Sequence, residues 1–266
     1  MSLAMTLRSR QLKTPNLRQV SLVCGFPDMG FVGKQSVDYL IQELKAELFR
    51  ELYSSHFPPH VLIRKDGTVE LMKNEFYYWK NPEGAWDLVF FTGNTQAASP
   101  EGQFEVVEEV LNLAQKYGVQ RIFTLSAHVV ESRSPDKPPK VYGAVTHVEL
   151  VKLLEKHGIA LLERGLIEGV QGLLLGEARL RGMEGLCLLG ETPAFTTPSG
   201  RPIVDAKSAR AVLEVLTKLL GIQVSMAELE KQAKLTEEFI LKLEKLEQSV
   251  LEKMVKARPP GQSYYV

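Results

Sequence analysis

A glycine-rich segment that contains a lysine is the part of this sequence whose residue types and spacing could bind a phosphate group. Its defining residues are Gly25, Gly30, Gly33 and Lys34. A Walker loop, however, would need glycine in place of Asp28 and serine or threonine in place of Gln35, and the dinucleotide fingerprint also needs glycine at position 28. Because an anionic Asp28 would repel a phosphate, we expect a tight turn whose glycines allow close packing, with a ligand-binding loop as the alternative.

The histidines and serines offer little further chemistry. His56 and His60 are the two histidines at a spacing typical of metal ligands, but the prolines between them prevent a shared helix face. No Gly-x-Ser-x-Gly segment is present, and Ser126 with His128, at the end of an apolar run, is the feature that most resembles an enzyme site. We therefore expect no catalytic residues, no metal and no cofactor.

Short apolar runs that alternate with longer amphipathic segments predict the elements that surround the glycine-rich segment. Such alternation is typical of strands joined by helical crossovers, so we expect an α/β fold with a mainly parallel sheet. The expected strands are residues 20–24, 86–91, 121–126, 159–162 and 186–189. The expected helices are a segment ending at residue 46 and residues 101–117, 146–156 and 205–220, the last of which ends at Gly221.

An insertion at residues 61–80 contains Asp66-Gly67, a strong signal for a β-hairpin. We expect its second strand to include the four consecutive aromatic residues 76–79. Alternate rings would then face the core and the sheet surface, and the alternative is a patch that binds a partner.

A long helix is expected near the C-terminus. Ser225 and Glu228 form a capping box, and Val224 can pack on Leu229 as a hydrophobic staple. Apolar residues then recur in a broken heptad, which predicts a helix that docks on the body or on a neighbouring subunit, with a coiled coil or a second helix beginning at Thr236 as alternatives. The prolines that follow Arg258 end the helix and predict a flexible tail.

These signals divide the chain into four parts. Residues 1–18 are expected to be an N-terminal extension, in which the first four residues precede a natural start at Met5. Residues 19–222 form the α/β domain, residues 223–257 the helical appendage and residues 258–266 the tail.

Composition narrows the classes of partner. The 32 Lys and Arg balance 32 Asp and Glu, so we expect no nucleic-acid partner, and no apolar run approaches the length of a membrane span. Cys24 and Cys187 both lie in apolar runs and are expected to be buried free thiols in a reducing cytoplasm.

Six segments of the chain follow a recognisable order: residues 25–34, 93–96, 143–144, 172–175 and 186–192 and the helix that begins at Asp205. In this order they resemble the proteasome assembly chaperone family of archaea and bacteria. The resemblance implies a three-layer α/β domain similar in topology to purine nucleoside phosphorylase, self-association into a homo-oligomer, and no established catalytic residues. Asp28 and Asn94 depart from the pattern, because the family has glycine and an acidic residue there.

The last three residues, Tyr264, Tyr265 and Val266, match the pattern with which proteins related to this family bind the proteasome core particle: a hydrophobic residue, then tyrosine, then any residue. The resemblance implies a non-enzymatic assembly chaperone or ATP-independent activator that docks on the outer-ring subunits. The alternatives are an orphan ligand-binding protein or enzyme of nucleoside phosphorylase topology, and an oligomeric scaffold.

Overall fold

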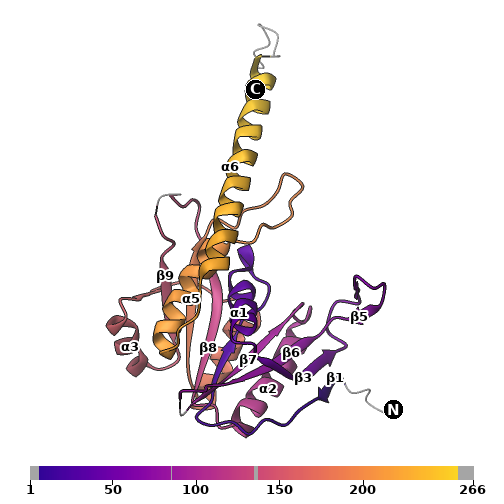
Figure 1. Cartoon of the computed structure of the whole chain (residues 1–266), viewed down its shortest axis with the longest axis vertical. Helices are drawn as coiled ribbons and strands as arrows, with labels where there is room; N and C mark the ends of the chain where they lie inside the picture. Colours follow the sequence, from indigo (N-terminus) through magenta and orange to yellow (C-terminus); the bar gives the residue numbers. More distant parts are fainter. Residues whose placement is uncertain (1–5, 85, 135–136, 257–266) are drawn as a thin grey trace.

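The computed structural model describes residues 6–84, 86–134 and 137–256 and consists of one large sheet with helices on both faces (Figure 1). The strands are β1 (Leu7–Gln11), β2 (Ser21–Cys24), β3 (Glu47–Ser54), β4 (Val61–Ile63), β5 (Val69–Leu71), β6 (Asn74–Lys80), β7 (Asp87–Gly93), β8 (Arg121–Val129), β9 (Val141–Val145), β10 (Ala160–Leu161) and β11 (Glu184–Thr192). The helices are η1 (Met29–Phe31), α1 (Val32–Glu43), α2 (Pro100–Lys116), η2 (Val148–Leu150), α3 (Val151–Lys156), α4 (Gly169–Leu180), α5 (Ala206–Leu220) and α6 (Ala227–Lys256).

The nine-stranded sheet has the order β1-β3-β6-β7-β2-β8-β11-β9-β10 and is mixed. Its centre, β7-β2-β8-β11, is parallel, whereas β1, β3 and β6 pair antiparallel with their neighbours up to β7, and β9 is antiparallel to β11. The expectation of a mainly parallel sheet is therefore wrong. The link between β6 and β7 spans only residues 81–86, which is too short for a parallel crossover and forces an antiparallel turn.

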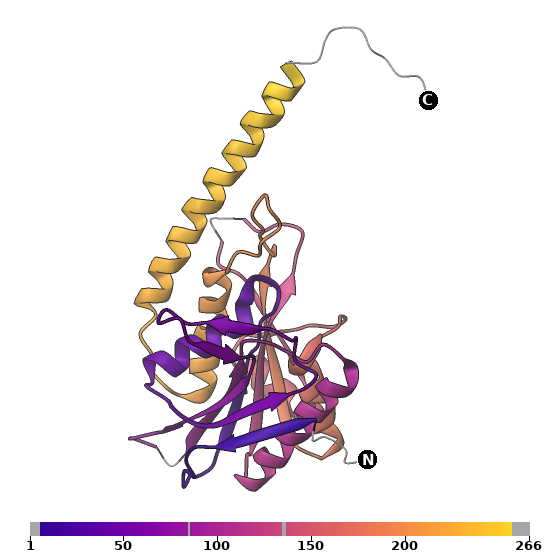
Figure 2. The same ribbon diagram turned by 90° about the vertical axis from the view of Figure 1, so that its right-hand side faces the viewer.

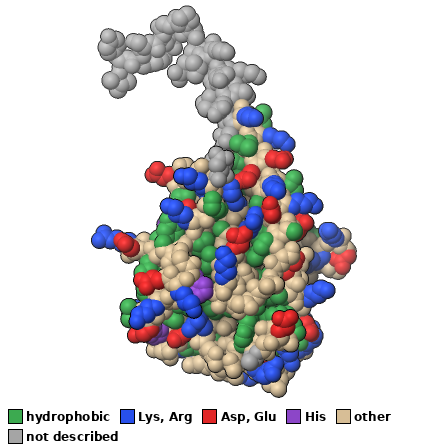
Figure 3. Space-filling view, turned by 60° about the vertical axis from the view of Figure 1, so that its left-hand side comes forward, with side chains coloured by type: hydrophobic (Ala, Val, Ile, Leu, Met, Phe, Trp, Pro, Cys, Tyr) green, Lys and Arg blue, Asp and Glu red, His purple; other side chains and the backbone are tan. Residues whose placement is uncertain are grey.

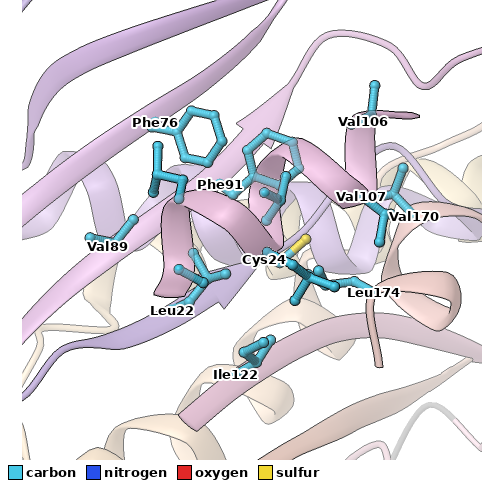
Figure 4. Packing of buried hydrophobic residues seen from close by; sticks show 14 of the residues in the cluster. Leu22, Cys24, Phe76, Val89, Phe91, Val106, Val107, Ile122, Val170 and Leu174 are labelled. Atoms are coloured by element: carbon cyan, nitrogen blue, oxygen red, sulfur yellow. The ribbon is translucent and has the colours of Figure 1, made fainter. Parts of the chain in front are cut away.

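Hydrophobic side chains alternate between the two faces of the central strands and make two cores. Leu22 and Cys24 of β2 face α2 and α4, where they pack with Val107 and Leu174 (Figure 4). Val23, between them, faces the opposite side, where α1 and α5 lie. Helices thus cover both faces of the sheet and make three layers.

Both cysteines are buried and free, as their apolar surroundings predict. Burial raises the pKa of the Cys187 thiol to about 12, and it raises that of Cys24 as well. Neither thiol is ionised at neutral pH, so both are inert core residues.

Two segments in the N-terminal half of the chain have a secondary structure or a pairing that the sequence analysis did not predict. Residues 7–11, within the predicted N-terminal extension, form β1 and pair with residues 50–54 of β3. The Asp66-Gly67 hairpin is present, but it joins β4 to β5, and the prediction that the aromatic residues form its second strand is wrong. They lie in β6 of the main sheet, where Phe76 is fully buried and stacks on Phe91 with ring centroids 4.5 Å apart.

Helix α6 packs on the body through its first turns. Leu229 and Ala233 are buried in the core that contains α5, and the Tyr39 hydroxyl donates to the Ser225 carbonyl at 2.7 Å. The helix continues through Thr236 to Lys256 instead of restarting there. Figures 1 and 2 show its remaining turns projecting beyond the body.

Candidate functional site

A pocket lies at the carboxyl ends of the parallel strands, where the chain direction favours a crevice. The chain leaves β2 toward α1 on one face of the sheet, whereas it leaves the adjacent β7 toward α2 on the other face. Such a switch point opens a crevice between the two connections. The pocket there has a volume of about 890 Å³ and is lined by the β2–α1 loop, the end of β8, the start of α4 and the loop after β11. Its polar lining includes Asp28, Gln96, Ser126, His128, Glu168 and Gln171.

The glycines of the β2–α1 loop allow close approach of the backbone. A Cβ atom on Gly25 would overlap the carbonyl oxygen of Gly33, and one on Gly33 would overlap the carbonyl oxygen of Leu125 in β8. Gly30 has a positive φ of 66°, and its carbonyl accepts from the Asp205 amide at 2.8 Å. These contacts support the interpretation of the segment as a tight structural turn.

Lys34 does not complete a phosphate site. Its ammonium pairs with Asp38 one turn later at 2.5 Å, and Lys34 is not part of the pocket lining. No Lys or Arg lines the pocket within the part of the chain that the structure describes. The loop therefore brings no cation to the place where a phosphate would bind.

We predict that Gly33→Ala will destabilise the fold by about 1–3 kcal/mol, because the new methyl group meets the backbone of β8 and not a movable side chain. Lys34→Ala, the matched control in the same loop, removes only a partly exposed ion pair and should change stability by less than about 1 kcal/mol. Chemical denaturation of both variants measures the difference. Equal stabilities would contradict the close-packing role of Gly33.

Asp28 takes the place of the glycine that a phosphate loop requires, and it supports the turn from inside. Its carboxylate accepts from the Gly33 amide at 3.1 and 3.2 Å, which satisfies a donor in the first turn of α1. Burial raises the pKa of Asp28 to about 7, against hydrogen bonds from the Gly33 and Ala127 amides and the Ser126 hydroxyl that lower it. Near neutral pH this carboxyl group is therefore partly protonated.

Ser126 and His128 line the pocket but do not form a catalytic pair. The Ser126 hydroxyl bonds to Asp28, and the His128 ring packs edge-on against Tyr142 with centroids 5.1 Å apart. A serine–histidine pair needs the hydroxyl and the imidazole within hydrogen-bond distance of each other, and neither contact joins Ser126 to His128. The structure thus gives this pair no arrangement for nucleophilic catalysis.

Two glutamines that the sequence analysis did not single out as site residues connect α4 to the β2–α1 loop. Gln96 donates to the Pro27 carbonyl at 3.1 Å and accepts from the Val170 amide at 2.8 Å. Gln171, only 1% exposed, donates to the Phe26 carbonyl at 3.3 Å. Glutamine carries no spacing signal of its own, so only the fold reveals this connection.

A cluster of carboxylates away from the pocket is filled by a lysine. Oxygen atoms of Glu51, Glu70 and Glu75 lie within 4.8 Å of one another, a grouping that could hold a metal ion. The Lys73 ammonium contacts all three carboxylates, at 2.6, 2.5 and 2.8 Å respectively. Lys73 therefore links the β4–β5 hairpin to β3 and β6. Arg10 pairs with Glu51, and Arg64 pairs with Glu70, so the outer side of the cluster carries further positive charge.

The predicted docking residues Tyr264, Tyr265 and Val266 lie outside the described residues, which end at Lys256 in α6. Among the helices that the structure describes, none is long and apolar enough to cross a membrane.

The described residues define a three-layer α/β protein whose pocket lacks both a phosphate loop and a catalytic serine pair. The chain belongs to the PAC2 family, whose model matches residues 22–244.

Similar proteins cover nearly the whole chain. An uncharacterized protein of Methanocaldococcus jannaschii is 40% identical over 247 residues, which are 92% of this chain and 91% of that protein. The crystal structure of Pyrococcus furiosus PbaB, an archaeal proteasome activator, is 40% identical with a TM-score of 0.83 and covers 91% of this chain and 100% of that one. The structure of Pyrococcus furiosus PbaA, an archaeal homolog of proteasome-assembly chaperone, is 26% identical with a TM-score of 0.72 and covers 93% and 96%.

Proposed function

We propose that this protein binds the proteasome core particle and acts as a non-enzymatic assembly chaperone or ATP-independent activator. The observation that carries the proposal is the likeness to PbaB, with 40% identity and a TM-score of 0.83 over all of that structure. The likeness to PbaA points to the same class of partner.

Docking would use the end of the chain. The ring of Tyr265 can be buried while its hydroxyl makes a hydrogen bond, and Tyr264 adds apolar area. The α-carboxylate of Val266 can pair with a lysine between neighbouring outer-ring subunits. From Ala257 onward the chain has ten residues, which reach at most about 33–36 Å when fully extended. The body can therefore remain outside a pocket that the tail enters.

We propose that α6 also joins copies of the chain into a homo-oligomer. Leu235, Phe239 and Leu246 are 57%, 45% and 61% exposed, and at 3.6 residues per turn they lie within about 40° of one another. Leu229 and Ala233, which contact the body, lie on a different side of the helix. Figure 3 shows hydrophobic side chains between charged ones along α6. An exposed apolar stripe of this kind is typical of a helix that packs against a partner.

The test of tail docking is capture of purified cognate core particle by the intact chain and by a chain that ends at Ser263. We expect the shortened chain to lose capture, because it lacks the ring and hydroxyl of Tyr265 and its terminal carboxylate lies three residues earlier in the chain. Val266→Leu is the matched control: it keeps a hydrophobic residue, tyrosine and a free terminus, and it should bind like the parent. If the chain ending at Ser263 retains full capture, docking does not use the tail.

The topology of purine nucleoside phosphorylase, the cytoplasmic location and the four-part division of the chain are further parts of this proposal, with β1 of the N-terminal part counted in the sheet of the α/β domain. The alternative, an orphan ligand-binding protein or enzyme, has the pocket in its favour. Absence of capture by the intact chain, together with a specific small-molecule ligand or substrate, would favour that alternative.

A further inference from the structure

We propose that the pocket at the carboxyl ends of β2, β7 and β8 binds a small uncharged or cationic molecule through its N–H groups, with the side-chain carbonyl of Gln171 as an acceptor. This inference is independent of the proposed proteasome docking, because it concerns the α/β body and not the tail.

The first observation is that the buried side-chain amide of Gln171 has a partner for its nitrogen but none for its oxygen among the described residues. Its amide nitrogen donates to the Phe26 carbonyl, which fixes the orientation of the amide, because the opposite orientation would bring two carbonyl oxygens together. The Oε1 atom is buried and has no protein partner among the described residues. A buried acceptor without a partner is unfavourable, and Gln171 belongs to the pocket lining. The acceptor therefore suits a ligand that carries a hydrogen-bond donor.

The charge of the lining decides which ligands can approach. Asp28 and Glu168 line the pocket, and within the described chain no Lys or Arg does. An anionic ligand would leave its own charge uncompensated next to Glu168, the partly ionised Asp28 and the Gln171 carbonyl. The start of α4 adds little for an anion, because Gln96 already accepts from the Val170 amide there. Amides, amidines, amines and nitrogen heterocycles fit this lining, whereas phosphates and carboxylates do not.

The size and the mouth of the pocket are the third observation. About 890 Å³ falls within the range of small-molecule sites. Met29, Val129 and Leu166 line it with side chains that are 60%, 53% and 85% exposed. Exposed apolar residues around a polar floor favour an organic ligand with an apolar part, such as an aromatic ring.

Three probes that share one ring test the inference: benzamide, benzamidine and benzoate, each titrated to about 10 mM and followed by protein-observed NMR of the full chain. We expect benzamide and benzamidine to shift resonances of pocket residues and to bind at least about tenfold more tightly than benzoate, because only they offer N–H donors to the Gln171 carbonyl.

Two variants locate the binding. Gln171→Met keeps the length of the side chain but removes the acceptor, and we expect it to weaken benzamide binding about fivefold or more. Because Gln171 is buried and this variant can lose stability, Met29→Trp provides a second test: it fills the exposed mouth and should abolish binding. Val148→Trp adds the same ring at an exposed position outside the pocket lining and should leave binding unchanged.

Benzoate binding as tight as benzamide binding, unchanged binding in Met29→Trp, or no binding of any probe at 10 mM would each overturn the inference. A chain that ends at Ser263 should bind the probes like the intact chain. Its loss of core-particle capture would therefore be a separate result, and neither outcome decides the other.

Discussion

The double variant Phe239→Glu/Leu246→Glu is expected to convert the proposed oligomer into a monomer and to weaken the proposed binding to the core particle by about 10²- to 10⁴-fold, although every tail is intact. A single short tail buries little surface and must be ordered on binding, so its own affinity is low. An oligomer holds several tails over one ring and makes each later binding event intramolecular. Two buried negative charges on the α6 stripe remove that advantage, because an unpaired carboxylate is costly to bury in an apolar contact.

Light scattering after size exclusion and equilibrium binding to immobilised core particle measure the two effects separately. Lys245→Glu is the matched control, since it changes the net charge by the same two units at an exposed position about 100° around the helix from the stripe. It should remain oligomeric and bind like the parent. A monomeric double variant with undiminished affinity would contradict the multivalent mode, and an unchanged oligomer would show that the contact lies elsewhere.

The elements with local signals could be predicted from the sequence. The helix expected at residues 205–220 is α5, where Asp205 accepts from the Ser208 amide at 3.0 Å and Gly221 has the left-handed φ of 66° expected after a helix end. The helix expected at residues 101–117 is α2, shifted by one residue. Caps, glycines and apolar periodicity act within a few residues, so a single sequence carries them.

Strands β3 and β9, which lie next to the edge strands β1 and β10, could not be predicted in this way. Residues 47–54 place Phe49 and Leu52 three apart, a spacing that a helix would also give, and their strand state depends on pairing with β1 and β6. Residues 141–145 lie between a proline-rich loop and a helix, and they pair with β11 some forty residues later. Such pairing depends on partners distant in the sequence, which local patterns do not specify.

The residues of the pocket could also be predicted only in part from the sequence. The glycines at positions 25 and 33 could be predicted as packing residues, because their spacing excluded a phosphate loop while their position at a strand end called for a tight turn. Gln96 and Gln171 are 75 positions apart, and the fold brings both to the one loop at residues 26–27. The periodicity of a sequence gives no information about such contacts between distant residues.

Replacing Lys73 by methionine should destabilise the fold by about 3–5 kcal/mol at neutral pH. The variant leaves the carboxylates of Glu51, Glu70 and Glu75 within 4.8 Å of one another without the ammonium that contacts all of them. Urea denaturation at pH 7 measures the loss. The exposed Lys65 in the hairpin is the matched control, and Lys65→Met should change stability by less than about 0.5 kcal/mol.

The pH dependence of this loss has a definite sign. Burial alone would raise the pKa of Glu51, but the hydrogen bond and charge of Lys73 outweigh it and hold the pKa below its ordinary value of 4.5. In the parent, Glu51 therefore contributes stability above pH 4.5 that is lost as the pH falls through its lowered pKa. In Lys73→Met, burial and the neighbouring carboxylates act on Glu51 without the lysine and raise its folded-state pKa, so protonation of Glu51 reduces the destabilisation of the variant as the pH falls. The gap between the two proteins should shrink below about pH 5.

A divalent cation should restore part of the stability that Lys73→Met loses. In Lys73→Met the three carboxylates offer an oxygen site of the kind that Ca²⁺ or Mn²⁺ prefers, so millimolar Ca²⁺ should raise the stability of the variant but not that of the parent, where the ammonium occupies the cluster. A variant as stable as the parent at pH 7, or a gap that stays constant from pH 7 to pH 4, would show that Lys73 does not hold this cluster together. Stabilisation of both proteins by Ca²⁺ would place the cation at another site.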